Sequence, residues 1–320
     1  MIHLPMRSFT LLSCFLSMTG VASATSKFRG ILQTKPIKAI FCDVDGTLTS
    51  GKDHTVSDRT FDSIKNVINN SDVLFFPATG RTRASMARVT HNRICDLFGA
   101  EEFTPGVYQQ GLSVYKLDGS LLHSHLLPPN IIKYIENYCK QENLDVIAYC
   151  QDIAHSTTLS KHTDICAEYQ DAAPSLVDKC TNLFNEASNL GIQKLIIVNR
   201  DPNRILEIKE TLKKDMKLAT LGAVVTQAVP EMCEILPPGQ SKGYGVQRIL
   251  NHLNIKNDEC IAFGDGENDI EMFQTIPRSF AVSNARDLLK QSSAAICDSN
   301  ENDGVASVLE ELLDLKLSSV

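Results

Sequence analysis

The apolar positions after residue 38 form short continuous runs that alternate with longer stretches of helical spacing. The runs at 38–42 and 73–76 predict buried strands, and apolar residues three and four positions apart predict helices from residue 57 and over 85–98. Gly99 is a usual stop signal for the second helix. Strands that alternate with helices in this way predict βαβ units and a parallel sheet covered on both faces.

The middle of the chain has a different order of elements. Asp118-Gly119 between two apolar runs predicts a hairpin, and Pro128-Pro129 then opens a helix. We next expect strands at 146–150, 194–198 and 223–227 and helices at 175–189 and 202–214. Pro237-Pro238-Gly239 marks the return to the first pattern. That pattern then predicts helices at 242–253, 267–275, 285–291 and 303–313 and strands at 260–264, 279–282 and 294–297.

These elements predict an α/β protein with a doubly wound, Rossmann-like parallel sheet that is interrupted by an inserted α+β cap domain. We place the first part of the core at 34–126, the cap at 127–232 and the second part of the core at 233–318.

Residues 1–24 have the layout of a secretory signal peptide, with Arg7, an apolar stretch from Phe9 to Val21 and the small residues Ala22-Ser23-Ala24. A signal predicts the secretory pathway or an endomembrane or organelle lumen. A leader that is only a disordered extension would leave the protein in the cytoplasm.

Cysteine usage favours a reduced protein. The sequence has ten cysteines and no C-x-x-C pair, and Cys42, Cys260 and Cys297 lie in strand-like apolar runs where a thiol behaves as a small hydrophobe. A disulfide within 139–180 stays possible.

Charge excludes two classes of function. The chain has 31 basic and 38 acidic residues, a net charge of −7, which argues against a nucleic-acid or membrane-surface binder. Outside the N-terminus no apolar run approaches the length of a membrane span, so we expect no stable membrane insertion after cleavage of the signal.

Acidic residues follow two of the predicted strands. Asp43 and Asp45 leave the first strand together, and carboxylate pairs can divide the roles of nucleophile and general acid/base. Asp265 and Asp269 follow the strand at 260–264 in the loop Gly264–Asp269. Carboxyl ends of parallel strands meet at one crevice, where these groups would repel unless a cation joined them, and oxygen ligands suit Mg²⁺.

Two further segments can hold an anion. Thr79-Gly80-Arg81 follows a strand, and Ser241-Lys242-Gly243 opens a helix, so hydroxyl, backbone N–H and ammonium groups are available. Each segment alone has an ordinary reading as a surface turn or a solvated lysine. Their order along the chain and their positions at strand ends argue against coincidence.

Together, DVDGTLT (43–49), ATGR (78–81), SKG (241–243) and FGDGENDIEM (263–272) resemble the haloacid dehalogenase superfamily. More narrowly, they resemble its Cof-type phosphatases with a type IIB cap, and the resemblance covers about residues 38–313. It implies a Mg²⁺-dependent phosphatase in which Asp43 is the nucleophile that forms an aspartyl-phosphate and Asp45 is the general acid/base. It also implies Mg²⁺ binding by Asp43, Asp265 and the Asp45 carbonyl, phosphate binding by Thr79, Gly80, Lys242 and Asn268, and orientation of the metal shell or of Lys242 by Asp269.

The resemblance implies a small phosphorylated metabolite as substrate, a phosphosugar above all, and leaves monomer and homodimer open. One departure is Gln109-Gln110-Gly111, where the family usually has Asn-Gly after the third core strand. The longer amide shifts any polar contact made there, so it bears on substrate detail.

Two alternative functions stay open. A phosphomutase is one, because the related phosphomannomutases share DVDGTLT. A non-catalytic secreted binding protein is the other, although the intact set of Asp43, Asp45, Lys242 and Asp265 speaks against it.

Other polar residues have less specific readings. His123 and His125 could be half a metal site, but a solvated hairpin edge is favoured without a third ligand nearby. Gln151, Asp152 and His155 are candidates for specificity on a cap loop, where an ordinary surface loop is the favoured reading.

Overall fold

The computed structural model describes residues 27–50, 55–99, 104–177, 191–227 and 229–317. The predicted signal peptide at 1–24, Cys14, Cys180 and most of the helix expected at 175–189 lie outside the described residues. In the described part of the chain, no helix combines the length and the apolar character that a membrane crossing requires.

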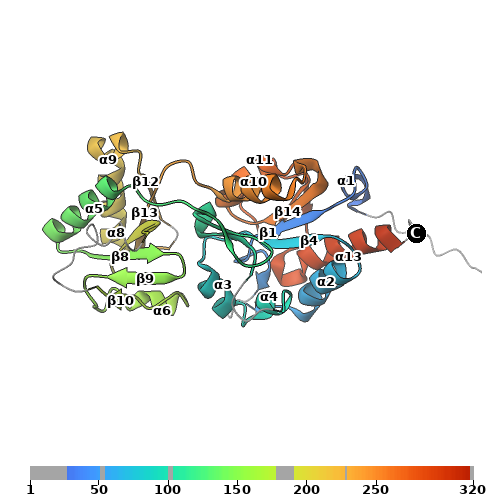
Figure 1. The fold of residues 1–320 in the computed structure, drawn as a ribbon, viewed down its shortest axis with the longest axis horizontal. Coiled ribbons are helices and arrows are strands. Elements are labelled where there is room, and N and C mark those ends of the chain that lie inside the picture. The colour runs from blue at the N-terminus through green and yellow to red at the C-terminus, as the bar shows by residue number, and fades with distance from the viewer. Residues whose placement is uncertain (1–26, 51–54, 100–103, 178–190, 228, 318–320) are drawn as a thin grey trace, which may run out of the picture.

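A five-stranded sheet, parallel throughout, forms the centre of the larger part of the molecule (Figure 1). In sheet order its strands are β16 (Ala295–Cys297), β15 (Ser279–Val282), β14 (Cys260–Gly264), β1 (Ala39–Cys42) and β4 (Leu74–Pro77). β1 is buried along its whole length and pairs with β14, in the register Ala39 with Cys260, and with β4 on the other side. All five carboxyl ends therefore lie at the same edge, as the alternating pattern predicted.

Helices cover both faces of this sheet (Figure 1). On one side lie α10 (Lys242–Leu253) and α11 (Ile270–Thr275), and on the other lie α2 (Asp58–Asn69) and α13 (Gly304–Leu317). Smaller elements complete the core: α1 (Arg29–Leu32), β2 (Thr49–Ser50), β3 (Thr55–Val56), α3 (Arg83–Val89), α4 (Arg93–Asp96) and α12 (Asp287–Ser292). Ile64 and Val67 of α2 are buried one turn apart, and Ser57 caps the helix, which explains why it forms here.

A three-stranded antiparallel sheet continues from the core. It consists of β5 (Gly106–Tyr108), β6 (Ser113–Tyr115) and β7 (Leu121–Ser124), and a bridge from Ala78 to Val107 places it beside the end of β4. The predicted hairpin is confirmed, with Gly119 at φ 75°, a conformation that glycine adopts without strain.

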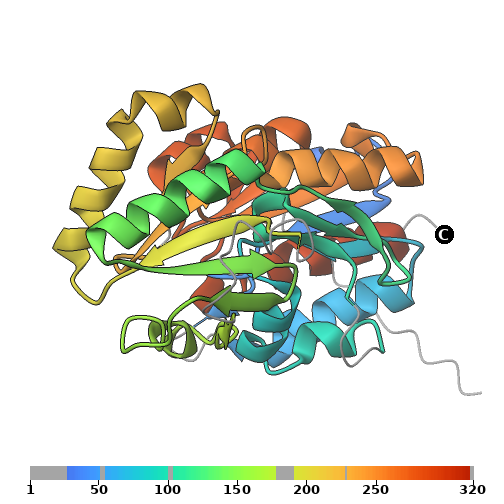
Figure 2. The same cartoon turned by 60° about the vertical axis from the view of Figure 1, so that its left-hand side comes forward.

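A second domain is inserted between β7 and α10 (Figure 2). Its six-stranded sheet has the order β10 (Ser175–Leu176), β9 (Ile153–Ser156), β8 (Asp145–Cys150), β11 (Lys194–Val198), β13 (Met232–Leu236) and β12 (Val224–Thr226). One face packs against α5 (Pro129–Glu142), α8 (Pro202–Lys214) and α9 (Met216–Thr220), and the other carries α6 (Ile165–Glu168). The predicted α/β fold with an inserted α+β cap is confirmed.

Two expected elements differ in the structure, and the sequence did not predict strand β13. The helix expected over 85–98 is two helices, α3 and α4, because His91 and Asn92 take positive φ values of 49° and 61° between them. Ser175–Leu176 pairs with β9 as a strand and does not begin a helix. β13 was not expected, and it pairs with β11 and β12, so the chain leaves the cap sheet after Leu236 rather than at residue 232.

The eight cysteines among the described residues are all buried and unpaired. Cys139, Cys150 and Cys166, which lie in the 139–180 region considered for a disulfide, are three of them. Burial raises the pKa of the Cys150 thiol to about 12, as expected for a thiol that serves as a packing group.

Candidate active site

The site lies at the carboxyl ends of β1, β4 and β14, where the predicted acidic and anion-holding segments meet. Asp43 follows β1 and is 4% exposed, and Lys242, the first residue of α10, is completely buried. The Lys242 Nζ donates to Asp43 Oδ1 at 2.5 Å and to Asp269 Oδ1 at 2.7 Å. Ser241 caps α10 by accepting from the Tyr244 N–H, which fixes where the lysine enters the site.

Asp43, Asp265 and Asp269 form an acidic cluster in which one carboxylate oxygen of each lies within 4.8 Å of the others. The loop after β14 folds around Asp269, because its Oδ2 accepts from the backbone N–H groups of Asp265 and Gly266 at 3.0 Å each. Burial raises the pKa of Asp43 well above its usual value; the charges of Asp269 and Asp265 act in the same direction, and Lys242 opposes them. Burial also raises the pKa of Asp265, and the Asp269 charge adds to this.

The acidic cluster suits a divalent cation. Its donors are oxygen atoms only, and three carboxylates with one ammonium leave two uncompensated negative charges. Gly46 has φ +76°, and a Cβ built on it would lie 2.6 Å from Asp265 Oδ2, so only glycine leaves room for this carboxylate. Of the groups of His, Cys, Asp and Glu in the described chain, this one alone brings three possible ligands together.

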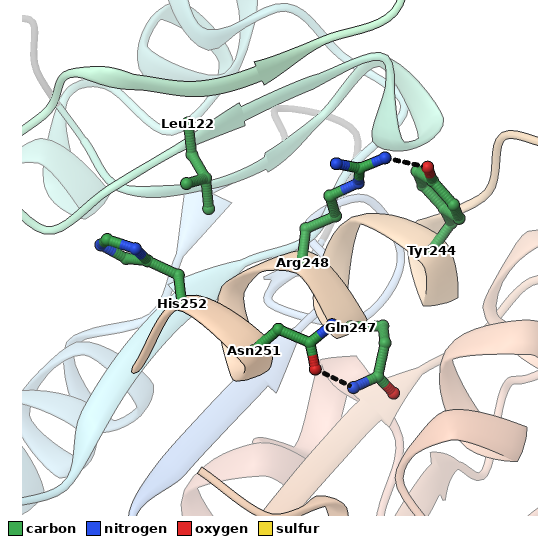
Figure 3. Close-up of a pocket in the computed structure, with 6 residues that line it drawn as sticks. All are labelled: Leu122, Tyr244, Gln247, Arg248, Asn251 and His252. Atoms are coloured by element: carbon green, nitrogen blue, oxygen red, sulfur yellow. Dashed lines mark hydrogen bonds between the residues drawn. The ribbon is translucent and has the colours of Figure 1, made fainter. Parts of the chain in front are cut away.

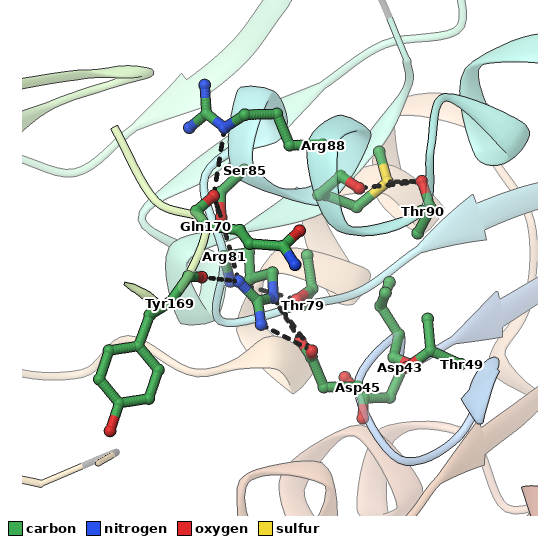
Figure 4. Close-up of polar contacts among 12 residues, drawn as sticks. Asp43, Asp45, Thr49, Thr79, Arg81, Ser85, Arg88, Thr90, Tyr169 and Gln170 are labelled. Carbon is green, nitrogen blue, oxygen red and sulfur yellow. Dashed lines mark hydrogen bonds and ion pairs between the residues drawn. The ribbon is translucent and has the colours of Figure 1, made fainter. Parts of the chain in front are cut away.

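The acidic cluster differs in membership from the predicted metal ligands. Asp269, expected to orient the metal shell, supplies an oxygen to it, while Lys242 lies between Asp269 and Asp43. The Asp45 side chain is not part of the cluster. It turns to Arg81, whose Nε lies 2.8 and 3.0 Å from the two carboxylate oxygens and whose Nη2 lies 2.9 Å from Oδ1 (Figure 4).

The predicted phosphate-binding loop follows β4. The buried Thr79 hydroxyl accepts from the Arg81 N–H at 3.1 Å. Asn268 is exposed, and its Nδ2 donates to Gln110 Oε1 at 3.3 Å. A Cβ built on Gly80 would lie 2.6 Å from Gln110 Nε2, so the Gln110 amide covers this glycine.

Gln110 is a site residue that the motifs did not assign. It belongs to the short 3₁₀ turn η1 (Gln109–Gly111), where Gln109 and Gln110 have φ values of 51° and 59°. Non-glycine residues hold this conformation only when the surroundings impose it. The departure from Asn-Gly was the available signal, and the structure places the longer amide between Gly80 and Asn268.

The cap residues considered for specificity hold the cap in place. Asp152 accepts from the Ala84 N–H at 3.1 Å and from Arg83 at 3.2 Å, so it docks the turn between β8 and β9 on the start of α3. The Gln151 N–H donates to Gln193, and the His155 ring pairs with Ser175 inside the cap. These contacts explain the residues without a substrate.

A surface pocket of about 470 Å³ lies outside the acidic cluster, between α10 and β7 (Figure 3). Its lining residues are Leu122, Tyr244, Gln247, Arg248, Asn251 and His252. His123 lies beside it, with its ring centroid 5.9 Å from that of Tyr244 and 6.0 Å from that of His125, and Gln240 is hydrogen-bonded to His125. Neither histidine joins a group of three possible metal ligands among the described residues.

The chain is similar to known proteins. A family described as haloacid dehalogenase-like hydrolase matches residues 40–309. The chain belongs to the haloacid dehalogenase-like hydrolases. Membership confirms the predicted Cof-type resemblance and the class of the enzyme, a phosphatase-type hydrolase.

Individual relatives of this haloacid dehalogenase-like hydrolase vary in length. The chloroplastic endoribonuclease YBEY of Arabidopsis thaliana is 33% identical over 84% of the chain, which spans about half of that protein (45%). The 5-amino-6-(5-phospho-D-ribitylamino)uracil phosphatase YwtE of Bacillus subtilis is 26% identical over 87% of this chain and 98% of its own. A solved HAD/COF-like hydrolase from Plasmodium vivax has a TM-score of 0.76 and 26% identity, over 90% of this chain and all of that one (100%).

Proposed function

We propose that the protein is a Mg²⁺-dependent phosphatase that hydrolyses small phosphomonoesters through an aspartyl-phosphate on Asp43. The observation that supports this best is the placement of Asp43. It is buried at the end of β1, with Oδ1 2.5 Å from the Lys242 ammonium, and its carboxylate, with one oxygen each of Asp265 and Asp269, forms a group whose members lie within 4.8 Å of one another. Such a site offers a nucleophile and positive charge at one point, which is what phosphoryl transfer requires.

In the first step the Asp43 carboxylate attacks phosphorus, and an O–P bond forms as the bond to the leaving alcohol breaks. Asp45 gives its proton to the leaving oxygen. In the second step Asp45 takes a proton from water, the water oxygen bonds to phosphorus, and Asp43 is released with free phosphate. Lys242, Thr79, Gly80 and Asn268 hold the phosphoryl oxygens in both steps, and Asp269 orients Lys242 through the bond between them.

Mg²⁺ would be held by Asp43 and Asp265, with the Asp45 carbonyl and the neighbouring Asp269 completing the acidic surroundings. A bound divalent cation there supplies positive charge to the phosphoryl oxygens and allows Asp43 to remain ionised despite its burial.

The substrate class we propose is a phosphorylated sugar or a related small polyol phosphate. The Bacillus subtilis relative is named for a phosphorylated ribityl compound. The cap supports a small substrate, because its Tyr169 carbonyl and Asp152 contact Arg81 and Arg83, next to the phosphate loop. A cap docked so close to the loop leaves little access for a phosphoprotein.

The test is phosphate release by the purified chain with Mg²⁺ over a panel of sugar, polyol and nucleotide monophosphates. Asp43→Asn should abolish release, whereas Glu267→Gln, an exposed acidic residue on the same loop as Asp265, should leave it unchanged. Acid-quenched protein should carry one phosphoryl group on the peptide that contains Asp43. Absence of release from every monoester would refute the proposal, and transfer of phosphate within a sugar without release would indicate a mutase.

A further inference from the structure

Arg81 connects the general acid/base to the cap (Figure 4). Its guanidinium makes three hydrogen bonds of 2.8 to 3.0 Å to the Asp45 carboxylate. The same guanidinium donates through Nη1 to the backbone carbonyl of Tyr169, a cap residue, at 2.9 Å. Asp45 and Tyr169, 124 residues apart in the chain, therefore share one planar cation, which presents its donors in a fixed geometry.

A second set of contacts joins Arg81 and α3 to the neighbouring cap residue, Gln170. The buried Ser85 hydroxyl accepts from Arg81 Nη1 and donates to the Gln170 carbonyl, each at 3.1 Å. Gln170 has φ +55°, a conformation that a non-glycine residue holds only when its contacts impose it. Arg88 also donates to the Gln170 carbonyl at 3.1 Å. The Tyr169 carbonyl is thus held by Arg81, and the Gln170 carbonyl is held by Ser85 and Arg88 of α3.

Arg81 was one of the residues expected to hold an anion, yet in the structure the anion that it holds is Asp45. The Asp45 carboxyl group must give a proton to a leaving oxygen and then take one from water, so its orientation has to be fixed. The arginine backbone is fixed as well, because its N–H donates to Thr79 Oγ1 and its carbonyl accepts from the Gln109 N–H. Its side chain can therefore transmit the position of the cap to Asp45.

We propose that Arg81 is a positioning residue through which the docked cap segment Tyr169–Gln170 sets the direction of the Asp45 carboxyl group. The inference rests on the proposed function, and it adds a role for a residue to which the chemistry assigns no bond with the reacting atoms. It makes general acid/base catalysis depend on the cap being docked, so that Asp45 is aligned when a substrate is covered.

The experiment compares Arg81→Met with Arg88→Met, a matched variant that loses a bond to the same cap carbonyl but has no bond to Asp45. Two esters are used: p-nitrophenyl phosphate, whose leaving group needs little help from an acid, and an alkyl phosphate that the parent hydrolyses. We expect Arg81→Met to lower kcat/KM for the alkyl ester about 100-fold and kcat/KM for the p-nitrophenyl ester less than tenfold. This ratio reports formation of the aspartyl-phosphate, the step in which only the alkyl leaving group needs the acid, and a positioned general acid contributes roughly 10²–10⁴.

Arg88→Met should change both esters by the same small factor, and Ser85→Ala should resemble Arg81→Met with a smaller loss. Added guanidinium should restore part of the alkyl-ester rate of Arg81→Met. Equal losses of kcat/KM with both esters would overturn the inference, since a residue that bound the phosphate directly would behave in that way.

Arg81→Met is checked for folding by circular dichroism. If it does not fold, Arg81→Lys is measured by the same criterion, because a lysine keeps the charge but lacks the planar fork that reaches Asp45 and Tyr169 together. A parent protein that releases no phosphate from either ester would overturn the proposed function. A parent that is active alongside an Arg81 variant with no leaving-group dependence would overturn only the positioning role.

Discussion

Replacing Lys242 with methionine changes the charge balance at the site, and we expect it to lower both the stability of the protein and the rate of phosphate release. The ammonium is completely buried and bonded to two carboxylates. Its removal leaves three carboxylates within 4.8 Å with no cation among them, so the uncompensated charge changes from −2 to −3. Breaking a buried ion pair in this way lowers the free energy of unfolding by about 3–5 kcal/mol. At roughly 2–4 °C per kcal/mol, the melting temperature should fall by roughly 6–20 °C.

The matched control is Lys194→Met. Lys194 is also buried and paired, with its Nζ 3.2 Å from Glu234 Oε1, but it lies in the cap sheet. Both variants should be destabilised in EDTA. Mg²⁺ should raise the melting temperature of Lys242→Met more than that of the parent, because the cation meets a more negative site. It should raise the melting temperature of Lys194→Met by the same amount as the parent.

Activity and a double variant complete the test. Phosphate release should fall at least 10²–10³-fold in Lys242→Met, the loss seen when one charge-stabilising donor is removed from an active site. Lys194→Met should stay within a few-fold of the parent. Adding Asp43→Asn to Lys242→Met should recover part of the lost stability, since one unpaired carboxylate is removed. The reasoning is wrong if Mg²⁺ stabilises the two lysine variants equally.

Two further predictions concern the metal and pH. Gly46→Ala should weaken Mg²⁺ binding at least tenfold by calorimetry, because its Cβ would displace Asp265. The control is Gly239→Ala, which has a similar φ of +72° and open space around it. This control should lose only about 1–2 kcal/mol of stability through backbone strain and should bind Mg²⁺ normally. The hydrogen bond from Arg59 lowers the pKa of Glu310 in the folded protein, so this pair contributes stability above pH ~4.5 that is lost as the pH falls through the lowered value. Glu310→Gln should therefore remove about 0.5 kcal/mol of stability at neutral pH and a smaller amount at pH 3 in urea titrations, and an equal loss at both pH values would contradict this.

The sequence predicted the elements whose ends are determined by residues at those ends. The helix at 242–253 was expected with the bounds that α10 has, because Ser241 caps its start and Asn254 ends it in the left-handed conformation. The sequence did not predict strand β13, and the cause is again a single residue within the element. Glu234 interrupts its apolar run, and the structure satisfies this buried carboxylate with Lys194 from the neighbouring strand. That partner is 40 residues away and leaves no trace in the pattern.

The same distinction holds for the site. Asp43 and Asp265 could be brought together from the sequence, since parallel strands place their carboxyl ends at one edge, and the family resemblance added Lys242 at the start of a helix. The direction of Asp45 toward Arg81 and the place of Gln110 beside Asn268 could not. Both depend on side-chain rotamers and on backbone conformations, such as the φ of 59° at Gln110, that only the assembled loops impose.

The register of the central sheet bears on how the chain is synthesised. β1 carries the nucleophile at its end and pairs with β14, which begins about 220 residues later, after the whole cap. At roughly 5–20 residues per second a ribosome needs roughly 10–45 s to deliver that partner. During this time one edge of an entirely apolar strand has no neighbour, while the cap strands can already pair with one another. The cap sheet of the nascent protein can therefore form before the core sheet that carries the site. Until then, the unpaired edge of β1 is the part of the chain that most needs protection by a chaperone.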